Sequence, residues 1–329
     1  MQRKWLWRTE MIFEKQVEKI YRSKMFCRCD DAGLARYFSY EDFAGMICEP
    51  FSFKGREGHT LNGAFYSYEK CREDKLIVFD HGMGGGHRSY MREIEVLCRS
   101  GFKVFAYDHT GCMTSEGENT GGFGRSLSDL NCCISALKGK FGENMRYSVI
   151  GHSWGGYSTL NFCAFHPDVE SIVAISGFAS VKRMVKQAFS GLLSPFSEKI
   201  YAIERSSNPD TVYCDAADSL ATYTGKALII HSYDDGMVSF EKHFAYLAKA
   251  LANKDNVRFL AVSDKKHNPN YTADAVKYLG EYGAKLQKAL KKGSLSSPED
   301  KAKFVASFDW YKMTEQDEAL WSEIIKVLS

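Results

Sequence analysis

The stretch from residue 147 to 156 constrains the fold more than any other part of the chain. An apolar run breaks there into glycine, serine and glycine before helix-compatible residues resume, which predicts a strand, a sharp turn and a helix. Gly151 and Gly155 remove side chains that would collide where strand and helix approach, and Ser153 between them is expected in a strained backbone conformation. Its hydroxyl should stand out at the top of a sheet. Because glycine and serine are common turn residues, the stretch alone leaves open that Ser153 is a plain turn serine.

Strands and helices alternate on both sides of this turn. An antiparallel pair of strands is expected at 51–53 and 61–68. Further apolar strands are expected at 76–79, 102–107, 171–176, 227–231 and 257–262, with amphipathic helices between most of them. Because strands that alternate with helices pair in parallel, the predicted fold class is α/β, with a doubly wound, mostly parallel sheet.

The alternation stops over residues 178–225, where two or three helical stretches are expected. Since it resumes afterwards, this segment is interpreted as a helical lid insertion over the sheet rather than a domain of its own. Helical spacing of apolar residues also predicts an N-terminal helical extension and a C-terminal helical segment packed on the core. The predicted organisation is therefore an extension at 1–48, a core at 49–177 and 226–292, the lid at 178–225 and the C-terminal segment at 293–329.

The composition indicates no global partner. The 43 Lys and Arg residues nearly balance 41 Asp and Glu residues, so no net charge attracts nucleic acid or an anionic membrane. The ten cysteines lack the spacing of zinc sites, which favours free thiols in a reducing compartment. Without a run of 18 apolar residues or a signal-peptide core, we expect a cytoplasmic protein with no stable membrane insertion. Trp5 and Trp7 leave a membrane-surface contact open, and a homodimer is also open.

Serine chemistry requires two further groups. A hydroxyl is a poor nucleophile near neutral pH unless a base takes its proton and an acid orients that base. Ligands of a doubly wound sheet collect at the carboxyl ends of its parallel strands, which restricts the search to strand ends. Two downstream strand ends carry suitable residues: Asp234 and Asp235 follow one strand, and His267 follows the next.

Together these residues resemble the α/β-hydrolase superfamily, in its serine-nucleophile branch of esterases, lipases, thioesterases and serine peptidases. The likeness covers roughly residues 50–292 and rests on four elements in the family's chain order. Residues 81–84 look like its H-G-x-G oxyanion loop, and residues 151–155 look like its nucleophile elbow. Residues 231–238 resemble its acid loop, and His267 stands in the place of its last catalytic residue.

The resemblance implies a role for each matching residue. Ser153 would attack the acyl carbon, His267 would act as general base and then general acid, and Asp235 would fix the histidine tautomer. The backbone N–H groups of Met83 and Trp154 would form the oxyanion hole, which leaves their side chains free to line the pocket. No cofactor and no metal ion are expected.

Several assignments have rivals. Asp234 competes with Asp235, although the acid-loop spacing to Val238 favours Asp235. Ser232 replaces the usual glycine of that loop, which puts its shape in doubt. His152, inside the elbow, is interpreted as a structural residue that faces away from the substrate. Three more histidines near strand ends are expected to be loop-packing residues, because none follows the acid strand: His81, His87 and His109.

The glycine run at 82–87 invites a different interpretation, a nucleotide-binding site. It follows a strand, and Asp108 ends the next strand, as a ribose-binding acid would. However, His87 occupies the third glycine position, and no G-x-x-x-x-G-K run exists. We therefore disfavour the nucleotide-binding reading.

The expected activity is hydrolysis of a carboxylic ester with a small to medium acyl group. The partner would be a small-molecule ester or a peptide-like substrate. Met184 and Phe189 in the lid are candidate substrate-binding residues, although such apolar stripes also serve as internal packing. A peptidase or aminopeptidase and a thioesterase of the same superfamily are alternatives, and so is a non-catalytic ligand-binding protein on this fold.

Overall fold

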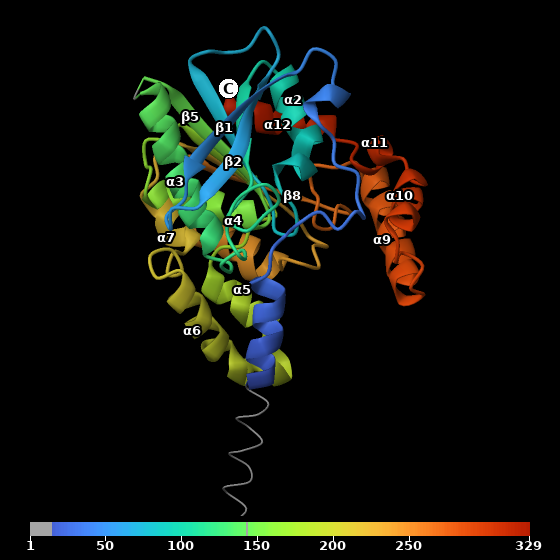
Figure 1. The fold of residues 1–329 in the computed structure, drawn as a ribbon. Coiled ribbons are helices and arrows are strands. Elements are labelled where there is room, and N and C mark those ends of the chain that lie inside the picture. The colour runs from blue at the N-terminus through green and yellow to red at the C-terminus, as the bar shows by residue number, and fades with distance from the viewer. Residues whose placement is uncertain (1–14, 143) are drawn as a thin grey trace, which may run out of the picture.

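The computed structural model describes residues 15–142 and 144–329. Eight strands form one sheet in the order β1-β2-β4-β3-β5-β6-β7-β8 (Figure 1). The pairs β1/β2 and β2/β4 are antiparallel, and all pairs from β4 to β8 are parallel. The predicted α/β class with a mostly parallel sheet is confirmed. The strands are β1 (Ile47–Lys54), β2 (Thr60–Ser67), β3 (Lys75–Asp80), β4 (Lys103–Tyr107), β5 (Arg146–His152), β6 (Ser171–Ile175), β7 (Lys226–Ser232) and β8 (Val257–Val262).

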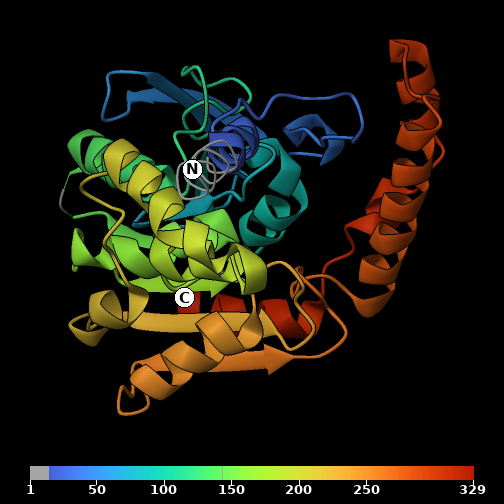
Figure 2. The same cartoon turned by 90° about the horizontal axis from the view of Figure 1, so that it is seen from below.

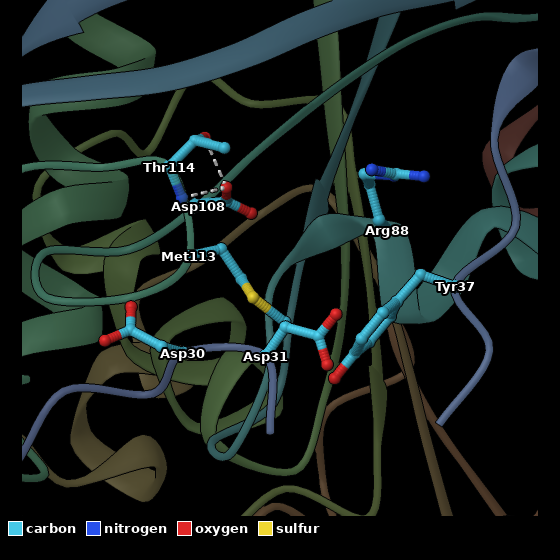
Figure 3. A pocket seen from close by; sticks show the side chains of 7 residues that line it. All are labelled: Asp30, Asp31, Tyr37, Arg88, Asp108, Met113 and Thr114. Carbon is cyan, nitrogen blue, oxygen red and sulfur yellow. Dashed lines mark hydrogen bonds between the residues drawn. The ribbon is translucent and has the colours of Figure 1, made fainter. Parts of the chain in front are cut away.

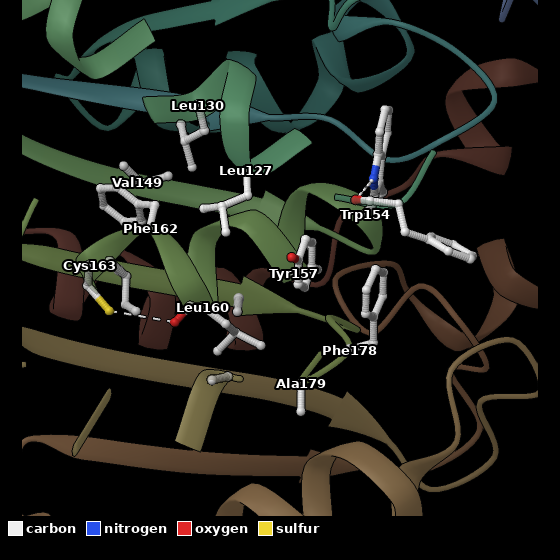
Figure 4. Close-up of a cluster of buried hydrophobic side chains, with 14 of the residues drawn as sticks. Leu127, Leu130, Val149, Trp154, Tyr157, Leu160, Phe162, Cys163, Phe178 and Ala179 are labelled. Carbon is white, nitrogen blue, oxygen red and sulfur yellow. Dashed lines mark hydrogen bonds between the residues drawn. The ribbon is translucent and has the colours of Figure 1, made fainter. Parts of the chain in front are cut away.

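The central strands are apolar along their length because both faces of the sheet are buried. In β3, Leu76 and Val78 face one apolar cluster, whereas Ile77 and Phe79 face the other. The first face is covered by α3 (Arg125–Phe141), α4 (Trp154–Asn161) and α8 (Tyr246–Ala250). Figure 4 shows side chains of α3 and α4 packed beside β5. The opposite face is covered by α2 (Met91–Arg99) and α12 (Glu318–Leu328).

The segment between β6 and β7 is helical, as expected. It contains α5 (Val181–Ala188), the 3-10 helix η4 (Gly191–Phe196), α6 (Ser197–Ser207) and α7 (Ala216–Ala221). In Figure 1, α5 and α6 lie below the sheet, together with an N-terminal helix, drawn in blue, that is described from residue 15 to 25. Tyr21 of that helix donates a 2.5 Å hydrogen bond to buried Glu204 of α6. The N-terminal helix therefore packs on this insertion. The expected contact of Trp5 and Trp7 lies outside the described residues.

The C-terminal part of the chain, from residue 273 on, departs from the expected organisation. The predicted core ran to residue 292, but α9 (Ala273–Lys291) leaves the body and forms an arm with α10 (Pro298–Ala306), which Figure 2 shows in orange and red. Only two residues of α9 are buried, Ala275 and Val276. Beyond them α9 packs on its own hairpin, where the ring of Tyr282 contacts those of Phe304 and Phe308. The sheet face is instead covered by α12, which follows the short helix α11 (Trp310–Met313).

Two helices are locally irregular. α4 ends at Asn161, whose amide donates to the Tyr157 carbonyl, and the chain continues as the 3-10 helix η3 (Phe162–Ala164). The helix before β8 begins as a π-helix, η5 (Phe240–Ala245). Two further 3-10 turns are η1 (Tyr40–Asp42) and η2 (His87–Tyr90). Within the described ranges, no helix has both the length and the apolar character that crossing a bilayer requires.

Candidate active site

Ser153 lies on the turn between β5 and α4, with φ of 57° and ψ of −109°. This positive φ is unusual for a residue with a side chain, and it is tolerated because the turn leaves no room for another course. A Cβ at Gly155 would lie 2.0 Å from the carbonyl oxygen of Asp80, and one at Gly151 would lie 2.3 Å from the carbonyl oxygen of Gly155. The strain and the crowding that the sequence predicted at this turn are both present.

The structure brings together three side chains from distant strand ends. Ser153 Oγ lies 2.8 Å from His267 Nε2, and His267 Nδ1 lies 2.8 Å from Asp235 Oδ2. Asp235 follows β7, and His267 lies in the loop between β8 and α9. The side chain of His267 is 12% exposed and that of Asp235 is fully buried. Such a chain of hydrogen bonds allows a proton to move from the serine hydroxyl to the imidazole.

The choice between the two aspartates follows from their contacts. Asp234 is exposed and its Oδ1 accepts from the backbone N–H of Lys266, at 3.1 Å. Asp235 instead contacts both His267 and His231, the latter at 3.2 Å. Burial alone would raise the pKa of the Asp235 carboxyl, but hydrogen bonds from His231, His267 and the Val238 N–H outweigh it and hold the pKa below its usual range. Asp235 is therefore an anion beside the His267 ring.

The predicted oxyanion loop lies against the serine turn. A Cβ at Gly82 would lie 3.4 Å from the Cβ of Ser153, so the main chain before Met83 passes directly beside the hydroxyl-bearing residue. Trp154 is the first residue of α4, where main-chain N–H groups have no partner within the helix. The Trp154 side chain is buried and its indole N–H donates to the Phe123 carbonyl, at 2.7 Å. Contrary to our expectation, its ring is not free to line an open pocket.

His152 links the serine turn to the histidine loop. Its Nε2 lies 2.8 Å from the backbone carbonyl of His267, and its Nδ1 lies 2.9 Å from the hydroxyl of Tyr90. That hydroxyl also accepts from the backbone N–H of Gly82, at 3.1 Å. Burial lowers the pKa of His152 to about 3, so the ring is neutral. Sequence reasoning placed His152 in a structural role but missed Tyr90, because an aromatic residue in an amphipathic stretch carries no signal of a polar contact.

The other histidines near strand ends are buried and partnered. His87 Nδ1 lies 2.7 Å from Asp108 Oδ1. His109 lies 3.0 Å from Asp80 and 3.3 Å from Asp129. Burial alone would lower the pKa of His109, but the two carboxylates outweigh it and raise the pKa to about 9. The third, His81, donates through Nδ1 to the carbonyl of Gly82, at 2.7 Å, and burial lowers its pKa to about 3.

The two candidate substrate-binding residues lie in different surroundings. Phe189 lines an apolar cavity of about 440 Å³ between the N-terminal helix and the 178–225 segment, where its ring centroid lies 5.9 Å from that of Tyr21. Met184 packs against the main apolar cluster. Phe123, whose carbonyl receives the Trp154 indole, is also in the cavity wall.

A second cavity, of about 290 Å³, lies beside the glycine run (Figure 3). The N-terminal residues Asp30, Asp31 and Tyr37 form one wall, and Arg88 of η2 and Asp108, which follows β4, also line the cavity. Asp108 accepts hydrogen bonds from the N–H groups of His87 and Thr114 and is thereby committed to the protein's own loops. The N-terminal extension therefore shapes the surroundings of the predicted oxyanion loop.

Comparison with known proteins places this geometry in context. The family model described as serine aminopeptidase, S33, matches residues 72–247, which include Ser153 and Asp235 but not His267. An esterase of Pyrococcus furiosus has a similar structure, with a TM-score of 0.58, 17% identity, and coverage of 82% of this chain and 98% of that one. The esterase Est1E of Butyrivibrio proteoclasticus, in a structure with bound ferulic acid, gives a TM-score of 0.54 at 16% identity, covering 71% of this chain and 99% of that one. The α/β hydrolase GrgF of a Penicillium species gives a TM-score of 0.51 at 14% identity, covering 79% of this chain and 99% of that one. These likenesses concern the fold.

Proposed function

Because the chain belongs to the serine aminopeptidase S33 family of α/β-hydrolases, we propose that it is a serine hydrolase that cleaves a carboxylic ester through an acyl-enzyme. The observation that carries this proposal is the unbroken chain of 2.8 Å contacts from Ser153 through His267 to Asp235. A serine that lacked a catalytic role would not need a strained turn, a largely shielded imidazole and an ionised carboxylate aligned behind it.

In the proposed reaction, Ser153 Oγ attacks the acyl carbon while His267 Nε2 takes its proton. The negative charge on the carbonyl oxygen would be held by the main-chain N–H groups of Met83 and Trp154, at a site beside the serine turn. His267 then gives the proton to the departing alcohol oxygen, which leaves an acyl group on Ser153. Water attacks that acyl group with His267 again as base, and the acid product and free serine result. Asp235 stabilises the imidazolium in both halves of the reaction.

The direct test is a Ser153→Ala variant assayed with p-nitrophenyl acetate and butyrate. Loss of the nucleophile is expected to lower kcat by roughly four orders of magnitude or more. The matched control is Ser135→Ala, which removes an exposed serine hydroxyl on α3 and should leave kcat unchanged. Equal turnover by wild type and Ser153→Ala would end the proposal.

Three alternatives give different outcomes. An aminopeptidase, the activity that the family's description names, would cleave aminoacyl p-nitroanilides faster than simple esters, and a thioesterase would prefer thioesters. A non-catalytic ligand-binding protein would not be labelled at Ser153 by a fluorophosphonate probe, whereas a competent triad would be. A substrate panel with this probe therefore separates the three enzyme classes from one another and from a binding protein.

A further inference from the structure

The loop that carries His267, residues 263–272 between β8 and α9, contains two strained positions. Asp264 and Lys266 have φ values of 61° and 47°, in the left-handed region that residues with side chains avoid. Such conformations persist only where the surroundings hold them. His267 directly follows one of them, so the position of its ring depends on whatever holds this loop.

The loop is held by a short stretch near the C-terminus, residues 314–317. Lys265 Nζ lies 2.7 Å from Asp317 Oδ2, with side chains only 12% and 28% exposed. The backbone N–H of Asp317 donates to the carbonyl of Asn270, at 2.8 Å, and that of Thr272 donates to the carbonyl of Glu315, at 2.9 Å. The two segments therefore lie side by side and exchange hydrogen bonds in a strand-like manner around an ion pair that is largely shielded from water.

Side-chain contacts extend this hold into the protein core. The Asn270 amide donates to Glu93 of α2 and to Gln316, each at 3.1 Å. Gln316 also accepts from the indole N–H of Trp321, at 2.8 Å. All four side chains are buried. Because buried polar groups are costly to leave unpaired, this network resists a shift of Asn270, which lies within the histidine loop.

Asp317 connects the loop to a fixed helix. Its Oδ1 accepts from the N–H of Leu320 and caps α12, while its Oδ2 faces Lys265. α12 itself is fastened to the sheet by a buried apolar face that packs against β6 and β7: Leu320, Trp321, Ile324, Val327 and Leu328. The sheet thus fixes the position of α12, and Asp317 at the start of α12 fixes the position of Lys265, two residues before His267.

We propose that residues 314–317 position His267 for catalysis, with the Lys265–Asp317 ion pair as the principal hold. This inference rests on the proposed serine-hydrolase function. It assigns a role in that reaction to a segment outside the family match, which ends at residue 247. Lys265 and Asp317 touch no reacting atom and act through the orientation of the imidazole.

The experiment compares Asp317→Asn with Glu323→Gln, using p-nitrophenyl butyrate. Asparagine caps a helix as well as aspartate does, so Asp317→Asn removes the charge facing Lys265 and keeps the cap of α12. Glu323→Gln breaks the Arg258–Glu323 pair, 2.9 Å, which also joins α12 to β8 but lies apart from the histidine loop. A displaced base is expected to lower kcat roughly tenfold to a hundredfold in Asp317→Asn, with KM within about twofold of wild type. Glu323→Gln should keep the wild-type kcat.

A further pair of measurements separates positioning from stability. Lys265→Met should lower kcat as Asp317→Asn does, and the double variant should lose no more than either single one, because both remove the same hold. The rate of fluorophosphonate labelling at Ser153 should fall by the same factor while the melting temperatures of Asp317→Asn and Glu323→Gln stay alike. Equal kcat in Asp317→Asn and Glu323→Gln, or strictly additive losses, would overturn the proposal. If instead wild type and Ser153→Ala hydrolyse the ester equally, the proposed function fails first, so the two failures are distinguishable.

Discussion

Replacing Asp235 by asparagine tests the orientation of His267 with a single atom exchanged. Asp235 Oδ1 accepts from the backbone N–H groups of Met237 and Val238, at 2.8 and 3.0 Å. The asparagine oxygen must take that place, because two main-chain donors point at it. The amide NH₂ then faces His267 Nδ1, where the carboxylate had accepted a hydrogen bond. The amide N–H of the asparagine then faces the Nδ1–H of His267, and these two donors repel each other unless the imidazole changes its tautomer.

The size of the effect follows from that tautomer change. With Nδ1 turned into the acceptor, the proton sits on Nε2 and points at Ser153 Oγ, so the ring can no longer take the serine proton. The imidazolium that forms in the reaction also loses its neighbouring anion. Loss of both contributions is expected to lower kcat by roughly 10⁴, about 5 kcal/mol of transition-state stabilisation.

The matched control is Asp234→Asn, at the exposed neighbouring carboxylate. Its Oδ1 accepts from the Lys266 N–H and an asparagine oxygen can do the same, so kcat for p-nitrophenyl butyrate should stay within about fivefold of wild type. Circular dichroism and melting curves would show whether each variant folds. The reasoning is refuted if Asp235→Asn keeps kcat within tenfold of wild type, or if Asp234→Asn is the more damaging change.

Two further predictions concern stability. The pKa of His109 in the folded protein, about 9, exceeds the ordinary value of 6.5. The charged ring beside its two carboxylates therefore stabilises the fold fully below pH 6.5, and this stabilisation is lost as the pH rises through 9. The free energy of unfolding in urea should therefore fall by about 3 kcal/mol over that interval in wild type but not in His109→Gln; parallel pH curves would contradict this. Gly155→Ala should cost about 3 kcal/mol or more, since its Cβ would lie 2.0 Å from a carbonyl oxygen. Gly280→Ala, in open space on α9, should instead add about 0.5–1 kcal/mol, and equal melting temperatures for the two variants would disprove the crowding argument.

The predictable parts of the fold are those that depend on residues close together in the sequence. Continuous apolar runs predicted the parallel strands, since a strand buried on both faces has no polar side to show. The serine turn was also predictable from neighbouring residues, because Gly151 and Gly155 leave out the side chains that would collide where the strand and the helix meet. The insertion at 178–225 was recognisable only as an interruption of the alternation, and its internal helices follow from local apolar spacing.

The course of α9 could not be predicted, because its apolar residues do not say which surface they meet. Tyr282 packs on Phe304 and Phe308 of its own hairpin, and the same spacing would equally suit a helix lying on the sheet. α10 begins at Pro298, directly after the serine-rich residues 294–297. The predicted core, which ran to residue 292, included α9, whereas long-range packing places α12 on that face of the sheet.

The three residues of the candidate site also differ in how far neighbouring residues predict them. Ser153 sits in a motif of five residues, and Asp235 sits in a looser pattern in which Asp234 remained a rival until the contact with His267 separated them. His267 has almost no local signature, because it lies among lysines in an irregular loop. Its environment depends on His152, 115 positions earlier, and on Asp317, 50 positions later. A histidine whose ring must be held by residues so far away can be located by its place after β8, but its support becomes visible only in three dimensions. The C-terminal segment should therefore tolerate substitution on its exposed face and resist it at residues 314–317, where its contacts reach the base.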